Sequence, residues 1–164
     1  MDTKKNNMRA WLTVLGCGML IAGSVTFYTV VIGNFFVPAS EELGSDYSSI
    51  SLYSTLVYIG IACGLPFVGN WLPKIPPIGI AGFAALQSIV VAILSFSTSV
   101  VWWWIGGWLI GVGMAFTSIV FISTVLTNWF TEKTGLAIGL AWALASVASA
   151  IMSPVTVSLM EMMD

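Results

Sequence analysis

Long apolar segments alternate with short polar connections along the whole 164-residue chain. The pattern predicts five apolar segments, at about residues 11–37, 50–72, 78–96, 100–126 and 136–160. At a rise of 1.5 Å per residue, each segment reaches roughly 28 Å or more, close to the hydrocarbon thickness of about 30 Å of a bilayer. The alternation of apolar and polar residues that is typical of barrel strands is not visible. Since backbone groups in lipid must bond within their own segment, we expect five transmembrane helices.

The composition supports this interpretation of the pattern. Hydrophobic residues make up 58% of the chain and charged residues 7%, whereas soluble domains carry about 25% charged residues. So few charges cannot cover the surface of a water-soluble fold of this length. The sequence therefore predicts an all-α integral membrane protein that crosses the cell membrane several times, with the lipid bilayer as its main partner.

The basic residues predict the orientation of these helices. They lie in the N-terminal flank and in the second and fourth connections: Lys4, Lys5, Arg9, Lys74 and Lys133. In a five-span chain all of these positions fall on one side, which the positive-inside rule makes cytoplasmic. We therefore expect a cytoplasmic flank (1–10), a five-span domain (11–160) and an outward tail (161–164). The first apolar run is too long for the core of a signal peptide, so we expect it to be retained.

Small residues recur at the four-residue spacing of closely packed helices. The glycine pairs are Gly60 and Gly64, Gly107 and Gly111, and Gly135 and Gly139. The last segment continues this spacing with Ala137, Ala141, Ala145 and Ser149. Such faces let helix backbones approach each other, so packing is the simpler interpretation. The alternative is that smooth faces allow helices to slide during transport.

Catalytic and metal-binding chemistry has little support in the residues. The chain has no histidine, its two cysteines (Cys17 and Cys63) lie in apolar runs, and no charged side chain lies well inside a span. Glycine-rich pieces such as GVGMAF lie within a span, not in a strand–turn–helix setting that binds nucleotides. We therefore expect no enzyme activity, no cofactor, no metal and no nucleic-acid partner.

Two polar and aromatic stripes are candidates for the lining of a solute cavity. Ser24, Tyr28 and Phe35 share one face of the first helix, and Thr117 and Phe121 share one face of the fourth, followed by Thr124 and Asn128. The two helices also share a weak repeat, GCGM and NFF in the first against GVGM and NWF in the fourth, which the predicted topology makes inverted. The alternative is that the hydroxyls bond to their own helix and the aromatic rings fill gaps. Trp102, Trp103 and Trp104 are typical of an interfacial belt and not of a site.

Two stretches resemble a known transporter family. NWFTEKTGLAIGL (128–140) is similar to the entry to the fifth helix in the major facilitator superfamily, and FFVPASEELGSDYSSISL (35–52) to the first outward loop of its oxalate/formate antiporter and monocarboxylate transporter branch. The resemblance runs from about residue 11 to 160. In the second connection, Gly69 and Lys74 keep two positions of the family motif, while Pro73 replaces its Asp and Pro76-Pro77 replace Gly-Arg. Glu132 and Lys133 form the charged turn of the fourth connection.

The resemblance implies an incomplete N-terminal six-helix half of a major facilitator fold. It lacks the sixth helix, the central loop and the second half, which in the oxalate-type relatives supplies the basic residues for an anionic substrate. The implied function is secondary transport of a small solute by alternating access, with an organic anion such as a monocarboxylate or dicarboxylate as substrate. We expect a partial transporter whose partner is the missing C-terminal half. The alternative is a small non-transporting membrane protein that acts as a scaffold or partner subunit.

Overall fold

The computed structural model describes residues 2–117, 119–130 and 132–162, and every element over these residues is a helix. Residue 1 of the predicted flank and residues 163–164 of the predicted tail lie outside the described residues. The elements are α1 (Asp2–Ile21), η1 (Ala22–Thr26), α2 (Phe27–Thr29), η2 (Val31–Phe35), α3 (Phe36–Glu42), α4 (Tyr47–Trp71), η3 (Leu72–Lys74), α5 (Pro77–Leu94), α6 (Val100–Thr117), α7 (Ile119–Trp129) and α8 (Thr134–Glu161).

The all-helical prediction is confirmed over the described residues, and the length and composition of the helices are compatible with a membrane protein. Four helical stretches of the described chain are long and apolar enough to cross a bilayer: Met8–Glu42, Tyr47–Trp71, Val100–Trp129 and Thr134–Glu161. The third predicted span corresponds to a shorter apolar helix, Ile78–Leu94. Whether this helix also crosses the membrane stays a prediction.

The first helical stretch ends later than the sequence pattern predicts. Pro38 was expected to open the first connection, but it lies in the first turn of α3, and the helix continues to Glu42. A proline in the first turn of a helix removes an N–H that has no partner within the helix, so it is tolerated there. The connection before α4 is therefore only four residues long, from Leu43 to Asp46.

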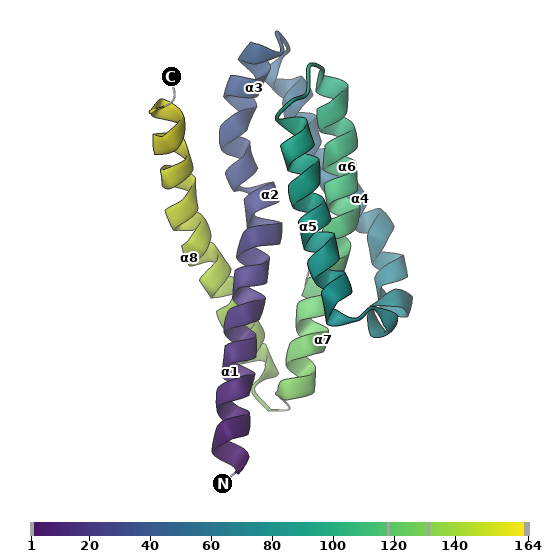
Figure 1. Ribbon diagram of the computed structural model, residues 1–164, viewed down its shortest axis with the longest axis vertical. Coiled ribbons are helices and arrows are strands. Elements are labelled where there is room, and N and C mark those ends of the chain that lie inside the picture. Colours follow the sequence, from purple (N-terminus) through teal and green to yellow (C-terminus); the bar gives the residue numbers. More distant parts are fainter. Residues whose placement is uncertain (1, 118, 131, 163–164) are drawn as a thin grey trace.

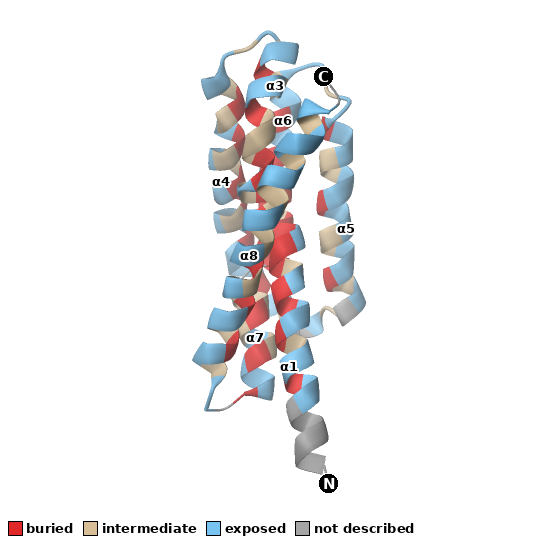
Figure 2. Cartoon of the chain, turned by 90° about the vertical axis from the view of Figure 1, so that its left-hand side faces the viewer, coloured by how far each residue is buried: buried red, intermediate tan, exposed pale blue. Residues whose placement is uncertain are grey.

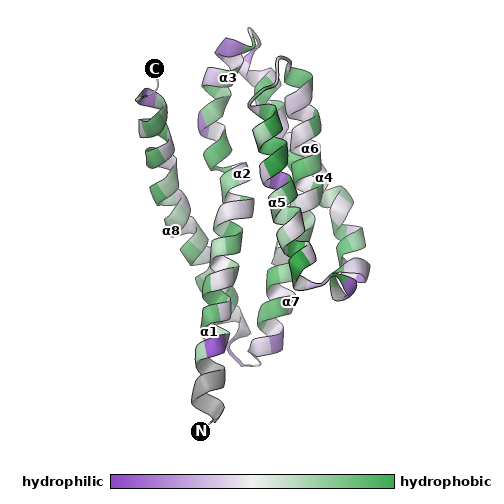
Figure 3. Ribbon diagram, viewed as in Figure 1, coloured by the Kyte–Doolittle hydropathy of each residue, from purple (hydrophilic) through white to green (hydrophobic). Residues whose placement is uncertain are grey.

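The helices run along the long axis of the molecule, with the two termini at opposite ends (Figure 1). The connection through η3 and the turn between α7 and α8 lie toward the N-terminal end, so the segments that carry the basic residues gather there. Hydrophilic positions concentrate near the helix ends, while the helices between them are mostly apolar, with a hydrophilic position partway along α5 (Figure 3). This arrangement is compatible with the predicted topology, whose orientation remains a prediction.

The tightest contact in the fold joins α4 and α6 through the predicted glycines. A Cβ added to Gly60 would collide with the backbone carbonyl of Trp108, and one added to Gly111 would collide with that of Val57. Gly64 and Gly107 are also crowded, though less tightly, by the Ala115 side chain and by Tyr53. Only a residue without a side chain lets the two backbones approach this closely.

A second contact packs α8 against α1. Ala137, Ala141 and Ala145 are buried on one face of α8, and a Cβ added to Gly18 of α1 would meet Leu144. Gly135 and Gly139 have no atom within 4 Å of such a Cβ, so the close packing predicted for them does not occur in the described chain. Buried positions line the inner faces of the helices, while the outer faces are exposed (Figure 2). The alanines of α8, not its glycines, therefore face the core.

Candidate functional site

The first helical stretch is irregular near its middle, and this irregularity positions the predicted residue Ser24. The helix changes to a π-type turn over Ala22–Thr26 and to a 3₁₀ turn over Val31–Phe35. The sequence here contains Gly23 and the β-branched residues Val25, Thr26, Thr29, Val30, Val31 and Ile32. Both residue types disfavour a regular α-helix. Short π segments inside helices are frequent at functional sites.

Three polar side chains from three helices meet inside the bundle beside this turn. The Ser24 hydroxyl donates to Gln87 Oε1 at 2.7 Å and lies 2.8 Å from Thr117 Oγ1, and Gln87 Nε2 donates to Thr117 Oγ1 at 3.3 Å. We call these three residues the polar triad. They are at most 2% exposed, and each lies close to the middle of its helical stretch. The sequence-predicted residues Ser24 and Thr117 are thus brought together by Gln87 of α5.

One arrangement of hydrogens satisfies all three bonds of the polar triad. The Thr117 hydroxyl donates to Ser24 Oγ, the Ser24 hydroxyl donates to Gln87 Oε1, and the Gln87 amide donates back to Thr117 Oγ1. Hydrogen bonds arranged in a ring strengthen one another in an apolar interior. The ring uses only one of the two N–H donors of the amide, so Gln87 has the capacity to bind a further acceptor.

Tyr28 continues the polar path one helical turn beyond Ser24. Its hydroxyl lies 3.0 Å from Ser88 Oγ, and its backbone carbonyl accepts a hydrogen bond from the Tyr53 hydroxyl at 3.4 Å. Tyr28 and Tyr53 are both buried. The irregular helix therefore connects α4 and α5 through polar contacts near the polar triad.

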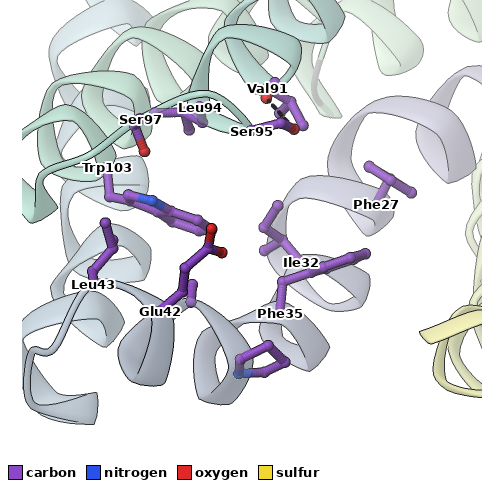
Figure 4. Close-up of a pocket in the computed structure, with 12 residues that line it drawn as sticks. Phe27, Ile32, Phe35, Glu42, Leu43, Val91, Leu94, Ser95, Ser97 and Trp103 are labelled. Atoms are coloured by element: carbon purple, nitrogen blue, oxygen red, sulfur yellow. Dashed lines mark hydrogen bonds between the residues drawn. The ribbon is translucent and has the colours of Figure 1, made fainter. Parts of the chain in front are cut away.

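Phe35 lies elsewhere, in a cavity of about 480 Å³ between the end of the first helical stretch and the α5–α6 connection (Figure 4). We call this cavity the upper pocket. It is lined by Phe27, Ile32, Phe35, Pro38, Ala39, Glu42, Leu43, Val91, Leu94, Ser95, Ser97 and Trp103. Most of these side chains are apolar, and Glu42 is the one charged residue among them. The size falls in the range of small-molecule sites.

The five predicted cavity residues thus do not line a single cavity. Ser24 and Thr117 belong to the polar triad, Tyr28 bonds to Ser88, and Phe35 faces the upper pocket. Phe121 packs against the apolar core between α1, α7 and α8. Farther along the same predicted stripe, Thr124 is exposed and bonds back to its own helix at the carbonyl of Val120. At this end of the stripe the hydroxyl therefore bonds within its own helix and the aromatic ring fills space in the core, which is the alternative interpretation of the stripe.

Sequence reasoning missed Gln87 and misjudged Trp103. Gln87 is the only glutamine of the chain, and a lone amide in an otherwise apolar span was the signal that could have identified it. Trp103 was expected in an interfacial belt, but it is buried against Phe36 and Tyr53 and lines the upper pocket. Trp104 is half-buried, and its indole N–H donates to the Ser49 carbonyl of α4 at 2.7 Å, so Trp102 is the one exposed ring of the triplet. Periodicity alone does not indicate which of the three rings meets a partner helix.

The residues of the predicted loop motif lie at the surface. Gly69 is near the end of α4, Lys74 ends η3, and Glu132 and Lys133 immediately precede α8; all four are exposed. Gly69 has no atom within 4 Å of an added Cβ. Their assignment to a cytoplasmic loop motif stays a prediction.

No cluster of three or more His, Cys, Asp or Glu side chains that suits a metal ion occurs among the described residues.

Comparisons with protein-family models, with curated proteins and with solved structures found no match. The interpretation of the site therefore depends on its own geometry.

Proposed function

We propose that this chain forms part of the pathway of a secondary transporter for a small solute. The observation that carries the proposal is the polar triad, in which Ser24, Gln87 and Thr117 meet between three helices near the middle of the bundle. Polar groups are costly in lipid, and those kept at this depth commonly mark solute or ion paths. Transporters place binding sites near the midplane, beside helices that are interrupted there.

The irregular first helix supports the same proposal. The Tyr28 carbonyl, between the π-type and 3₁₀ turns, accepts a hydrogen bond from the Tyr53 side chain of α4. A segment of this kind changes its hydrogen bonds at a lower cost than a regular helix. Alternating access requires such a segment beside the site, because the helices on either side must rearrange.

The resemblance to the major facilitator superfamily suggests a more specific version of the proposal, with a missing partner half and a class of substrate. In that form the chain supplies the N-terminal helices, and a C-terminal half completes the site with the basic residues that an organic anion such as a monocarboxylate requires. No charged side chain belongs to the polar triad, so recognition of a charged solute must involve other groups.

A second function is favoured by the outer face of α8. Gly135 and Gly139 are exposed and have open space around them, whereas a GxxxG face is typically buried between helices. We therefore keep the alternative of a scaffold or partner subunit that packs against another membrane helix.

The experiment that tests the proposal is solute uptake. The full chain is reconstituted into liposomes, alone and with a candidate C-terminal half, and uptake of radiolabelled monocarboxylates, dicarboxylates and neutral solutes is measured. We expect uptake that Gln87→Leu reduces at least tenfold and that Ser146→Ala, an exposed serine bonded to its own helix, leaves unchanged. Equal uptake by the wild type and Gln87→Leu would contradict a role for the polar triad.

A further inference from the structure

The upper pocket combines a carboxylate, aromatic rings and an unpaired hydroxyl. Glu42 is its one charged residue, while Phe27, Phe35 and Trp103 supply the rings. Figure 4 shows the Glu42 carboxylate turned toward the Trp103 indole, with the Ser97 side chain pointing into the same space. We propose that the upper pocket binds a small organic cation, an ammonium group attached to an apolar body. This inference goes beyond the proposed function and does not depend on it.

The charge distribution around the pocket favours a cation over an anion. Glu41 and Asp46, one and four residues from Glu42 in the chain, lie at this end of the bundle. The five Lys and Arg residues of the chain belong to segments near the opposite end: the N-terminal flank, η3 and the turn before α8. A site lined by one sign of charge attracts the opposite sign and repels its own. An organic anion would find no basic partner in the lining.

The aromatic lining suits the same ligand. Trp103 is held by edge contacts with Phe36 and Tyr53, at centroid distances of 6.3 Å and 5.9 Å. A ring fixed in this way loses little freedom when a ligand binds. Indole faces attract ammonium groups, and the attraction is stronger in a partly dry site. The apolar residues around it, such as Leu43 and Leu94, suit an aryl or alkyl body.

The hydroxyl of Ser97 gives the third contact. Its oxygen is buried and has no hydrogen-bond partner within the described part of the chain, whereas the neighbouring Ser95 bonds back to the carbonyl of Val91 at 3.3 Å. A buried polar atom without a partner is costly unless a ligand or water supplies one. An N–H of a primary ammonium group would satisfy the Ser97 oxygen, while a quaternary ammonium group has no N–H to donate.

Binding to the full chain in nonionic detergent tests the proposal, with four ligands of one shape and different charge. We would measure the affinities of phenethylamine, phenethyltrimethylammonium, 3-phenylpropionate and phenethyl alcohol by titration calorimetry. We expect both cations to bind more tightly than the alcohol and the carboxylate. Equal affinities for all four, tighter binding of 3-phenylpropionate, or no binding of either cation would overturn the proposal.

Two substitutions and a control assign the contacts. Glu42→Gln should weaken binding of both cations about fivefold, the effect of an exposed ion pair. The control, Glu41→Gln, removes the same charge from the adjacent position, which is also exposed but does not line the pocket, and should leave both affinities nearly unchanged. Ser97→Ala should weaken phenethylamine about fivefold and leave phenethyltrimethylammonium unchanged. Equal effects of Glu42→Gln and Glu41→Gln would show that the pocket carboxylate is not the partner, and would overturn the proposal.

The ammonium group of the natural ligand could belong to a lipid headgroup or to a free amine. Competition by added lipid distinguishes these two sources. If phosphatidylethanolamine competes with phenethylamine while phosphatidylglycerol does not, the natural ligand is a lipid ammonium group and the recognition chemistry stands. If neither lipid competes, the ligand is a free amine. If both compete equally, the pocket holds acyl chains and the proposed cation site is wrong.

Discussion

Gln87 is the residue on which the interpretation of the interior depends most. It is buried in the mostly apolar helix α5, and its amide joins Ser24 and Thr117 into the polar triad. Each neighbour alone has a common explanation, because serine and threonine hydroxyls often bond within their own helix. An amide held by two other helices does not have that explanation.

The bond between Thr117 and Gln87 is tested by replacing the hydroxyl with a methyl group. Thr117→Val keeps the shape of the side chain but leaves the Gln87 amide with no acceptor in the triad. We expect a loss of about 1–3 kcal/mol in the free energy of unfolding, the cost of an unsatisfied buried polar group. Unfolding in detergent, followed by circular dichroism, measures the loss.

Thr124→Val is the matched control for this substitution. Thr124 is exposed, and its hydroxyl bonds only to the carbonyl of Val120 in its own helix. Its replacement should change stability by less than about 0.5 kcal/mol, as is usual for exposed positions. If Thr117→Val and Thr124→Val lower the free energy of unfolding by the same amount, the bonds of the polar triad stabilise the fold no more than a hydroxyl bonded to its own helix.

Helix packing could be predicted from the sequence where glycines face each other, and less well elsewhere. The spacing of Gly60, Gly64, Gly107 and Gly111 identified four residues of the α4–α6 contact. The same spacing at Gly135 and Gly139 did not find the packed face of α8, because a periodic pattern does not say which of two neighbouring small-residue faces meets a partner. Ala141, two positions from Gly139, lies on the face that does.

The α4–α6 contact is tested by adding one methyl group. In Gly111→Ala the new Cβ would collide with the backbone carbonyl of Val57, which no rotamer change relieves. We expect a loss of about 1–3 kcal/mol or more in the free energy of unfolding, the usual cost of overpacking. Thermal or denaturant unfolding in detergent measures it.

Gly139→Ala serves as the control in a helix with open space around the glycine. Here the added Cβ meets no atom within 4 Å, and alanine favours a helix over glycine by up to about 1 kcal/mol. This variant should be as stable as the wild type or more stable. A loss in Gly139→Ala equal to that in Gly111→Ala would mean that the glycines act through the backbone alone and not through the contact.

The sequence could predict the fold class of the molecule and the approximate limits of its helices, because both depend on the order of apolar and polar residues along the chain. It could not predict the polar triad or the upper pocket, since both combine residues far apart in the chain. Ser24 and Thr117 are 93 residues apart, and Glu42 meets Ser97 and Trp103 only because α3 lies beside the α5–α6 connection. The irregular turn in the first helix, which contains Ser24, is indicated in the sequence only by Gly23 and a run of β-branched residues.

The number of membrane crossings is tested by the accessibility of the two ends of α5. Asn70→Cys, near the end of α4, and Thr98→Cys, after α5, are placed separately in a background with Cys17→Ala and Cys63→Ala. If α5 crosses and the positive-inside rule holds, an impermeant maleimide labels Thr98→Cys on intact cells, and labels Asn70→Cys only after permeabilisation. Both positions keep all five basic residues. Labelling of both from the same side would show that α5 does not cross the membrane.

The central claim is that the polar triad belongs to a path that opens to water. Ser24→Cys, with Cys17→Ala and Cys63→Ala, places a thiol in the triad. The native Cys17, with only Cys63→Ala, gives a thiol that is also buried, in the apolar core between α1, α7 and α8. The measurement is the rate at which a small, charged, membrane-impermeant methanethiosulfonate modifies each thiol in reconstituted protein. We predict that Ser24→Cys reacts at least tenfold faster than Cys17, because a transport path must expose its site. Equal rates for the two thiols would contradict the account and favour the non-transporting alternative.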